Sequence, residues 1–92
     1  MTNEEQIASD CFNFDQSFYE WVIPRLKFLR DENPTYPTKF KNMRAYRAML
    51  NRIIRGFEIQ SNNLTWSRTR RQNGIIAIAW MEFRDNIDDL WM

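Results

Sequence analysis

The sequence predicts an all-α fold, a compact three-helix bundle formed by one domain of 92 residues. The first observation is that apolar residues recur at spacings of three and four in three separate stretches. The second is that the chain has only two glycines and three prolines, too few turn formers for a barrel of many short strands. The third is its seven Phe, four Trp and three Tyr, which supply the apolar area that a small core needs.

The first helix is expected over about residues 15–30. Its apolar face continues on both sides of Pro24, which removes a backbone donor, so we expect one helix kinked there. The residues that define this face are Phe18, Val22, Leu26 and Leu29. Residues 1–13 show no comparable pattern and are expected to form a loosely ordered arm.

A loop at residues 31–38 is expected to separate the first helix from the second. Pro34 and Pro37 disfavour helix there and push the residues before them towards extended backbone. The second helix should start near Thr38 or Asn42 and end between Gly56 and Gln60. Its apolar arc consists of Met43, Tyr46, Met49, Leu50, Ile53, Ile54 and Phe57.

The third helix is expected to run from Ser67, a suitable cap, to the C-terminus. Residues 75–80 also resemble a short apolar strand after Gly74, but a single strand has no evident partner, so helix is preferred. The predicted core of the whole bundle is Phe18, Trp21, Val22, Leu26, Leu29, Met43, Tyr46, Leu50, Ile53, Phe57, Ile76, Trp80, Phe83 and Ile87.

Charge is distributed in an acid–base–acid pattern although the chain is almost neutral, with 13 basic and 12 acidic side chains. Residues 1–38 carry three basic and seven acidic side chains, and residues 39–71 carry nine basic and one acidic. Residues 72–92 carry one basic and four acidic side chains. Two interpretations stay open: the basic helix neutralises its acidic neighbours, or it presents a positive face to an anionic partner.

The candidate binding residues form a basic face opposite the apolar arc of the second helix, joined by three arginines that follow this helix in the sequence. They are Lys41, Arg44, Arg47, Arg52, Arg55, Arg68, Arg70 and Arg71. Arginine binds phosphate and carboxylate in a forked geometry and stacks on bases, which suits nucleic acid or an acidic protein surface. Trp66 beside this run could stack on an unpaired base, or it could fold into the core.

The composition argues against an enzyme. The chain has no His and one cysteine, Cys11, which excludes the common nucleophile systems, His-bearing zinc sites and an intrachain disulfide. Glu82, Asp85 and Asp89 share a helical spacing that suits a hard cation, but a solvated acidic face is the commoner explanation. We therefore expect no catalytic residues, no metal and no cofactor.

The chain also carries no visible targeting or membrane segment. The N-terminus is acidic and lacks an apolar signal region, and the longest apolar run, Ile75 to Met81, is far shorter than a membrane span. A protein that acts inside a cell and does not enter a membrane is expected.

Several short motifs resemble those of a group of small tailed-phage proteins. They are the W-x-x-P-R-L pattern of Trp21 to Leu26, the Tyr36-Pro37 pair, the apolar stretch Leu50 to Phe57 and the terminal Asp89-Leu90-Trp91. The second helix is more basic here than in the similar proteins. The resemblance implies an all-helical fold and a phage or prophage protein that acts in the cytoplasm of a bacterial host; it implies no activity and no site residues.

The expected function is that of a non-catalytic binding protein that occupies a surface of a host or phage protein or protein–nucleic acid complex. An inhibitor of a host defence nuclease belongs to this class. The alternatives are a nucleic-acid-binding accessory protein that uses the basic face, and a structural component of the virion. The apolar end, Leu90-Trp91-Met92, should dock on the chain's own core or across a homodimer.

Overall fold

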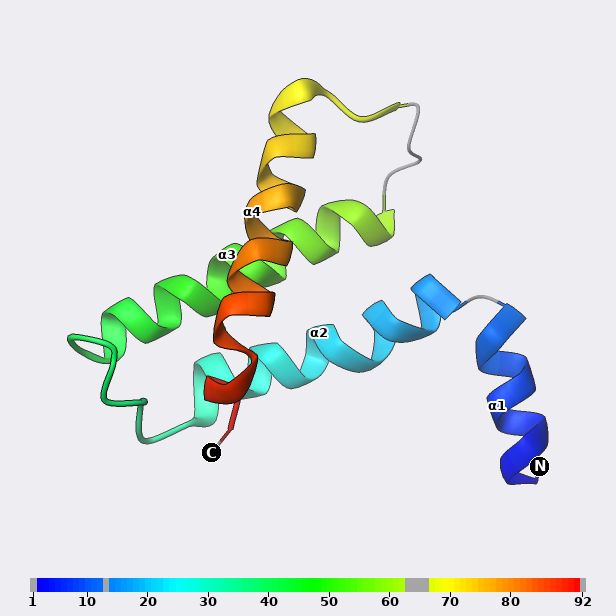
Figure 1. The fold of residues 1–92 in the computed structure, drawn as a ribbon, viewed down its shortest axis with the longest axis horizontal. Coiled ribbons are helices and arrows are strands. Elements are labelled where there is room, and N and C mark those ends of the chain that lie inside the picture. Colours follow the sequence, from blue (N-terminus) through cyan, green and yellow to red (C-terminus); the bar gives the residue numbers. More distant parts are fainter. Residues whose placement is uncertain (1, 13, 63–66, 92) are drawn as a thin grey trace.

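Four α-helices form the fold of the described residues, which are 2–12, 14–62 and 67–91 of this computed structural model. The helices are α1 (Asn3–Phe12), α2 (Phe14–Glu32), α3 (Met43–Asn62) and α4 (Arg70–Asn86), and a short 3-10 turn, η2 (Ile87–Asp89), follows α4 (Figure 1). The described residues contain no strand, so the all-helical prediction is confirmed and residues 75–80 are helical. The predicted number of three main helices is wrong.

The additional helix is α1, which lies where the sequence predicted a loosely ordered arm. Its first turn is closed by a capping box, because the Glu5 amide donates to Thr2 Oγ1 at 3.1 Å and the Thr2 amide donates to Glu5 Oε2 at 3.3 Å. Its described side chains are exposed apart from the half-buried Asp10. Local capping rather than an apolar face therefore defines this helix, so apolar periodicity does not predict it.

Helices α2 and α4 both pack on α3, whereas α1 contacts α2. Helices α2 and α3 lie side by side, joined by residues 33–42, and α4 crosses over α3 until its C-terminal end reaches α2 (Figure 1). Helix α2 continues through Pro24 and ends at Glu32, two residues beyond the predicted end. The Arg25 side chain donates to the carbonyl oxygen of Trp21 at 2.7 Å, in the turn that Pro24 perturbs.

The buried core is centred on α3, as the apolar arc predicted. Its members are Tyr19, Val22 and Leu26 of α2, Tyr46, Met49, Leu50, Ile53, Ile54 and Phe57 of α3, and Ile76 and Ala79 of α4. Four further predicted core residues are partly buried against it: Phe18, Leu29, Met43 and Phe83. The prediction is confirmed for most of its members.

Three predicted core residues are exposed instead. Trp21 is 58% exposed because it lies outside the arc of α2 that Val22 and Leu26 bury against the rest of the chain, and Ile87 is 55% exposed because α4 ends at Asn86 and the helical phase is lost. Trp80 is 38% exposed and lies at the rim of the core. Helical spacing alone does not identify which of two apolar faces is buried.

Helices α3 and α4 cross at two small residues, Gly56 and Ala79. Both are buried, and a Cβ atom at position 56 would lie 2.9 Å from the carbonyl oxygen of Ile75 and 3.3 Å from the Cα of Ile76. The absence of a side chain at Gly56 therefore allows the two helix backbones to approach.

The end of the chain is bound to α3 and to the segment between α2 and α3. The buried Tyr46 hydroxyl donates to the carbonyl oxygen of Asp89 at 2.8 Å, and the buried Asn33 amide donates to that of Trp91 at 2.8 Å. Lys39 forms an ion pair with Asp89 at 2.7 Å. Leu90 packs on the chain's own core, which is one of the two docking modes expected for this end.

Alkaline pH should destabilise the fold through Tyr46. Burial raises the pKa of this phenol above its usual value of 10.0, and the nearby Asp89 adds to the effect. A raised pKa means that the folded state favours the neutral phenol. The contribution of this phenol to the free energy of unfolding is therefore complete below about pH 10 and is lost as the pH rises through the raised pKa. Chemical denaturation across pH 8–11 should show a shallower alkaline loss for Tyr46→Phe than for the parent, with Tyr36→Phe, at an exposed position, as the control.

Candidate functional site

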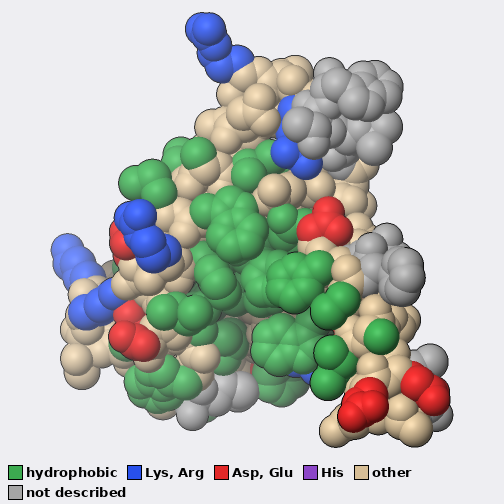
Figure 2. Space-filling view, turned by 45° about the vertical axis from the view of Figure 1, so that its right-hand side comes forward, with side chains coloured by type: hydrophobic (Ala, Val, Ile, Leu, Met, Phe, Trp, Pro, Cys, Tyr) green, Lys and Arg blue, Asp and Glu red, His purple; other side chains and the backbone are tan. Residues whose placement is uncertain are grey.

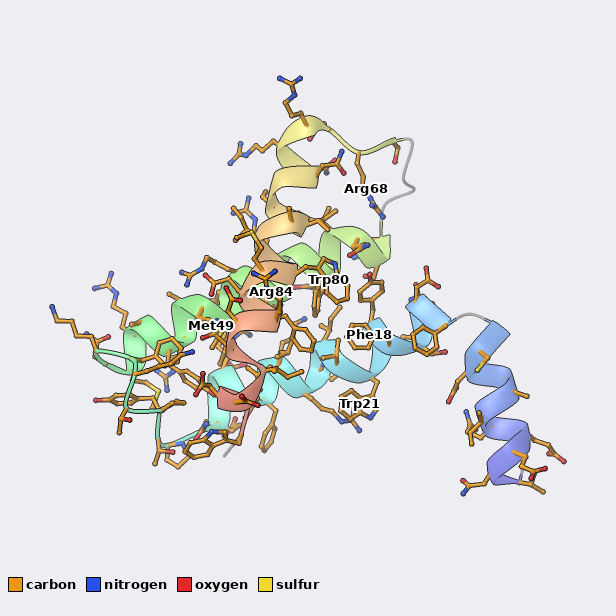
Figure 3. The ribbon with its side chains drawn as sticks, in the orientation of Figure 1. Phe18, Trp21, Met49, Arg68, Trp80 and Arg84 are labelled. Atoms are coloured by element: carbon orange, nitrogen blue, oxygen red, sulfur yellow. The ribbon has the colours of Figure 1, made fainter. Side chains whose placement is uncertain are left out.

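The predicted basic residues are mostly on the surface, but they do not all lie together. Those of α3 and its approach are exposed, and so are the two in the first turn of α4: Lys41, Arg44, Arg47, Arg52, Arg55, Arg70 and Arg71. Arg68 is half-buried, and its guanidinium donates to the carbonyl oxygen of Gln60 at 3.3 Å, beside the end of α3 (Figure 3). Trp66 lies outside the described residues.

Some of the positive charge is neutralised within the chain. Arg52 Nε lies 2.6 Å from Glu82 Oε1 and so connects α3 to α4. The pKa of Asp31 is held below its usual range, chiefly because Arg30 binds it and further because Arg47 lies nearby. Basic side chains therefore offset acidic neighbours in part of the basic face. Arg44 and Arg55 belong to the rest of this face and are exposed on α3.

A second surface is apolar and was not among the predicted sites. Apolar side chains gather over the middle of one face of the molecule, and Lys and Arg lie mainly at its edges (Figure 2). A groove with a volume of about 650 Å³ lies between α2 and the end of α4, with Val22 and Leu26 among its lining residues. We call it the aromatic groove, and its exposed walls include Trp21, Pro24, Arg25, Phe28 and Ile87.

Helix α2 has two apolar faces, and only one of them is used by the fold. Tyr19, Val22 and Leu26 are buried against the rest of the chain. Phe14, Trp21 and Phe28 follow one another at intervals of seven residues and are 70%, 58% and 55% exposed. An interval of seven places side chains on one side of a helix, so these three residues form a single outward stripe.

Trp21 is held in a defined position on this stripe. Phe18, which precedes it by three residues on α2, lines the same hollows but is half-buried, whereas Trp21 projects outward (Figure 3). The guanidinium carbon of Arg25 lies 4.3 Å from the centre of its ring, and the same guanidinium binds the carbonyl oxygen of Trp21. A cation–π contact together with a hydrogen bond orders a side chain that would otherwise move freely.

The groove extends along α2 towards α1. A second hollow of about 500 Å³ shares Phe18, Trp21 and Arg25 with the aromatic groove and reaches Gln6 and Asp10 of α1. The two hollows together follow α2 from Phe14 to Leu29, about 22 Å at 1.5 Å per helical residue. This length and shape suit an extended occupant such as a helix.

No group of three or more acidic or cysteine side chains in residues 2–12, 14–62 and 67–91 is arranged to hold a metal ion, and Cys11 is exposed on α1. None of the helices in these ranges is long and apolar enough to cross a membrane. The aromatic groove is the candidate functional site, because its walls include apolar side chains that the fold leaves exposed.

The sequence did contain a signal for this site. Aromatic residues spaced by seven on a helix whose other face is already apolar indicate a second contact surface, and Arg25 follows Trp21 by one helical turn. Comparison with protein-family models, curated proteins and solved structures gave no match. The assignment of the site accordingly depends on the geometry described above.

Proposed function

We propose that this chain is a non-catalytic protein-binding module that acts by occupying a surface of another macromolecule, with the aromatic groove as its binding surface. The observation that carries the proposal is the outward stripe of Phe14, Trp21 and Phe28, which the fold leaves exposed. A contiguous exposed apolar patch typically marks a protein interaction site, whereas apolar residues that are exposed singly are common on any protein surface.

The composition of the groove supports a protein partner over a small ligand. Trp and Arg are the residues that most often dominate binding energy at protein interfaces, and here Arg25 already orders Trp21. A side chain that is ordered before binding loses less conformational entropy on binding. The groove is also open along its length, which suits a partner helix laid into it.

The resemblance to small phage proteins adds a biological setting to the proposal. In that setting the chain acts in the cytoplasm of a bacterial host, and its partner is a host or phage protein. Blocking a host machine, including a defence nuclease, needs only an occupied surface and no chemistry. This part of the proposal depends on the quoted motifs and on the size of the chain.

Replacing Trp21 by glutamate should abolish partner binding while the fold is retained. The side chain is 58% exposed, and exposed substitutions usually change stability by no more than about 0.5 kcal/mol. Met81→Glu is the matched control, because Met81 is 53% exposed on α4 and does not line the aromatic groove. The measurement is capture from nuclease-treated host lysate, and equal capture by both variants would exclude the groove.

A nucleic-acid-binding function is the second candidate, supported by the exposure of Arg44 and Arg55 on α3. Direct binding to phosphates should weaken steeply with salt, since each phosphate contact releases counterions. Arg44→Glu with Arg55→Glu should then reduce binding of a fluorescent single-stranded or duplex oligonucleotide by at least about tenfold, because two attractions become repulsions. If the parent chain does not bind the oligonucleotide even at low salt, a nucleic-acid-binding function is excluded.

A further inference from the structure

The aromatic groove needs an occupant that matches both its shape and its few charges. This inference rests on the proposed function, since it identifies a partner for the same surface. The stripe of Phe14, Trp21 and Phe28 has the seven-residue interval with which two α-helices pack along a common seam. A second copy of α2 carries the same interval, so in a parallel pair each aromatic residue would meet its own counterpart.

The charges beside the stripe favour this occupant and this direction. Glu20 precedes Trp21 directly, Arg25 follows it by four residues, and both side chains are exposed on opposite flanks of the stripe. In a parallel pair of helices, opposite flanks face each other, so Glu20 of one copy lies beside Arg25 of the other. In an antiparallel pair, Glu20 would face Glu20 and Arg25 would face Arg25, so like charges would meet.

We infer that the aromatic groove binds a second copy of this chain, through parallel packing of α2 against α2 of the partner. Trp21 forms the central layer of the seam, and Glu20 and Arg25 form two equivalent ion pairs across the two-fold axis. An interface of this kind requires only one surface, used twice. Arg25 keeps its hydrogen bond to the Trp21 carbonyl and still has N–H groups available for the carboxylate.

Sedimentation equilibrium over a series of concentrations tests the dimer. The parent should rise towards twice its monomer mass as the concentration increases into the micromolar range. Trp21→Glu should weaken the association by at least about a hundredfold, because it buries two like charges at the centre of the seam. Met81→Glu, on α4 outside the groove, should associate as the parent does.

A mixing experiment tests the ion pairs and excludes a general effect of charge. Glu20→Arg alone and Arg25→Glu alone should each weaken self-association by at least about tenfold, since each places like charges together twice. An equimolar mixture of the two variants should recover parental association, because every contact in the mixed dimer again joins opposite charges. Native mass spectrometry identifies the mixed species by its mass.

Three results would overturn the inference. They are a parent that stays monomeric to millimolar concentration, a dimer that survives Trp21→Glu, and a mixture that associates no better than its components. The first of these leaves the proposed function intact if Trp21→Glu still loses capture of a different partner. Loss of the proposed function would instead appear as equal capture by Trp21→Glu and Met81→Glu.

Discussion

Gly56→Ala should strongly destabilise the protein, although alanine is the better helix former. The added methyl group would meet the Cβ of Ala79 and lie 2.9 Å from the carbonyl oxygen of Ile75. Both atoms belong to α4 at its crossing with α3 and cannot rotate away as the end of a flexible side chain would. We expect a net loss of about 2–3 kcal/mol, in which overpacking exceeds the helix-propensity gain of about 1 kcal/mol.

Gly74→Ala is the matched control for this prediction. Gly74 also lies within a helix, but a Cβ atom there would have no neighbour within 4 Å. Only the propensity gain remains, so the variant should be more stable than the parent by up to about 1 kcal/mol. Urea denaturation followed by circular dichroism measures both variants. Equal shifts for the two would show that α3 and α4 do not cross closely at Gly56.

Phe57→Ala should have the largest effect of any single substitution considered. Phe57 is fully buried, and its ring centre lies 4.7 Å from that of Trp80, 5.4 Å from that of Phe83 and 5.8 Å from those of Phe18 and Tyr19. Removing a buried phenylalanine typically costs about 3–5 kcal/mol, which is comparable to the whole stability of a small domain. The variant should therefore be largely unfolded at room temperature.

Trp80→Ala should cost less than Phe57→Ala, although the sequence places both residues in the core. Its ring stacks on Phe18 at 5.8 Å and its indole nitrogen donates to Gln60 at 2.7 Å, but the residue is 38% exposed. Thermal melts of both variants decide the order. If Trp80→Ala melts at the lower temperature, the rim of the aromatic cluster contributes more than its centre.

The periodicity of α3 was enough to predict its position and its buried face. Each of the seven residues of its predicted arc is buried or half-buried, because one arc is apolar and the opposite arc is basic. Helix α2 differs because it is apolar on two faces, and a sequence pattern does not distinguish the face that packs within the chain from the face that remains outside. Trp21 was therefore assigned to the core, although it belongs to the stripe.

The basic face was predicted from the same helix, but its relation to neighbouring helices was not. The ion pair of Arg52 with Glu82 depends on how α4 crosses α3, and that crossing is set by the close approach at Gly56. Spacing within one helix contains no information on such a crossing. Helix α1 was missed for another reason, since the Thr2 and Glu5 capping box is a sequence signal that apolar periodicity does not include.

Site-specific photo-crosslinking addresses the aromatic groove itself. A photoreactive phenylalanine analogue placed at Phe28, which is 55% exposed in the groove, should form protein adducts in cells, with a second copy of the chain among them. The same analogue at Arg55, exposed on α3, should form few protein adducts. Adducts that arise mainly from position 55, or that join the chain to nucleic acid, would contradict the groove as the binding surface.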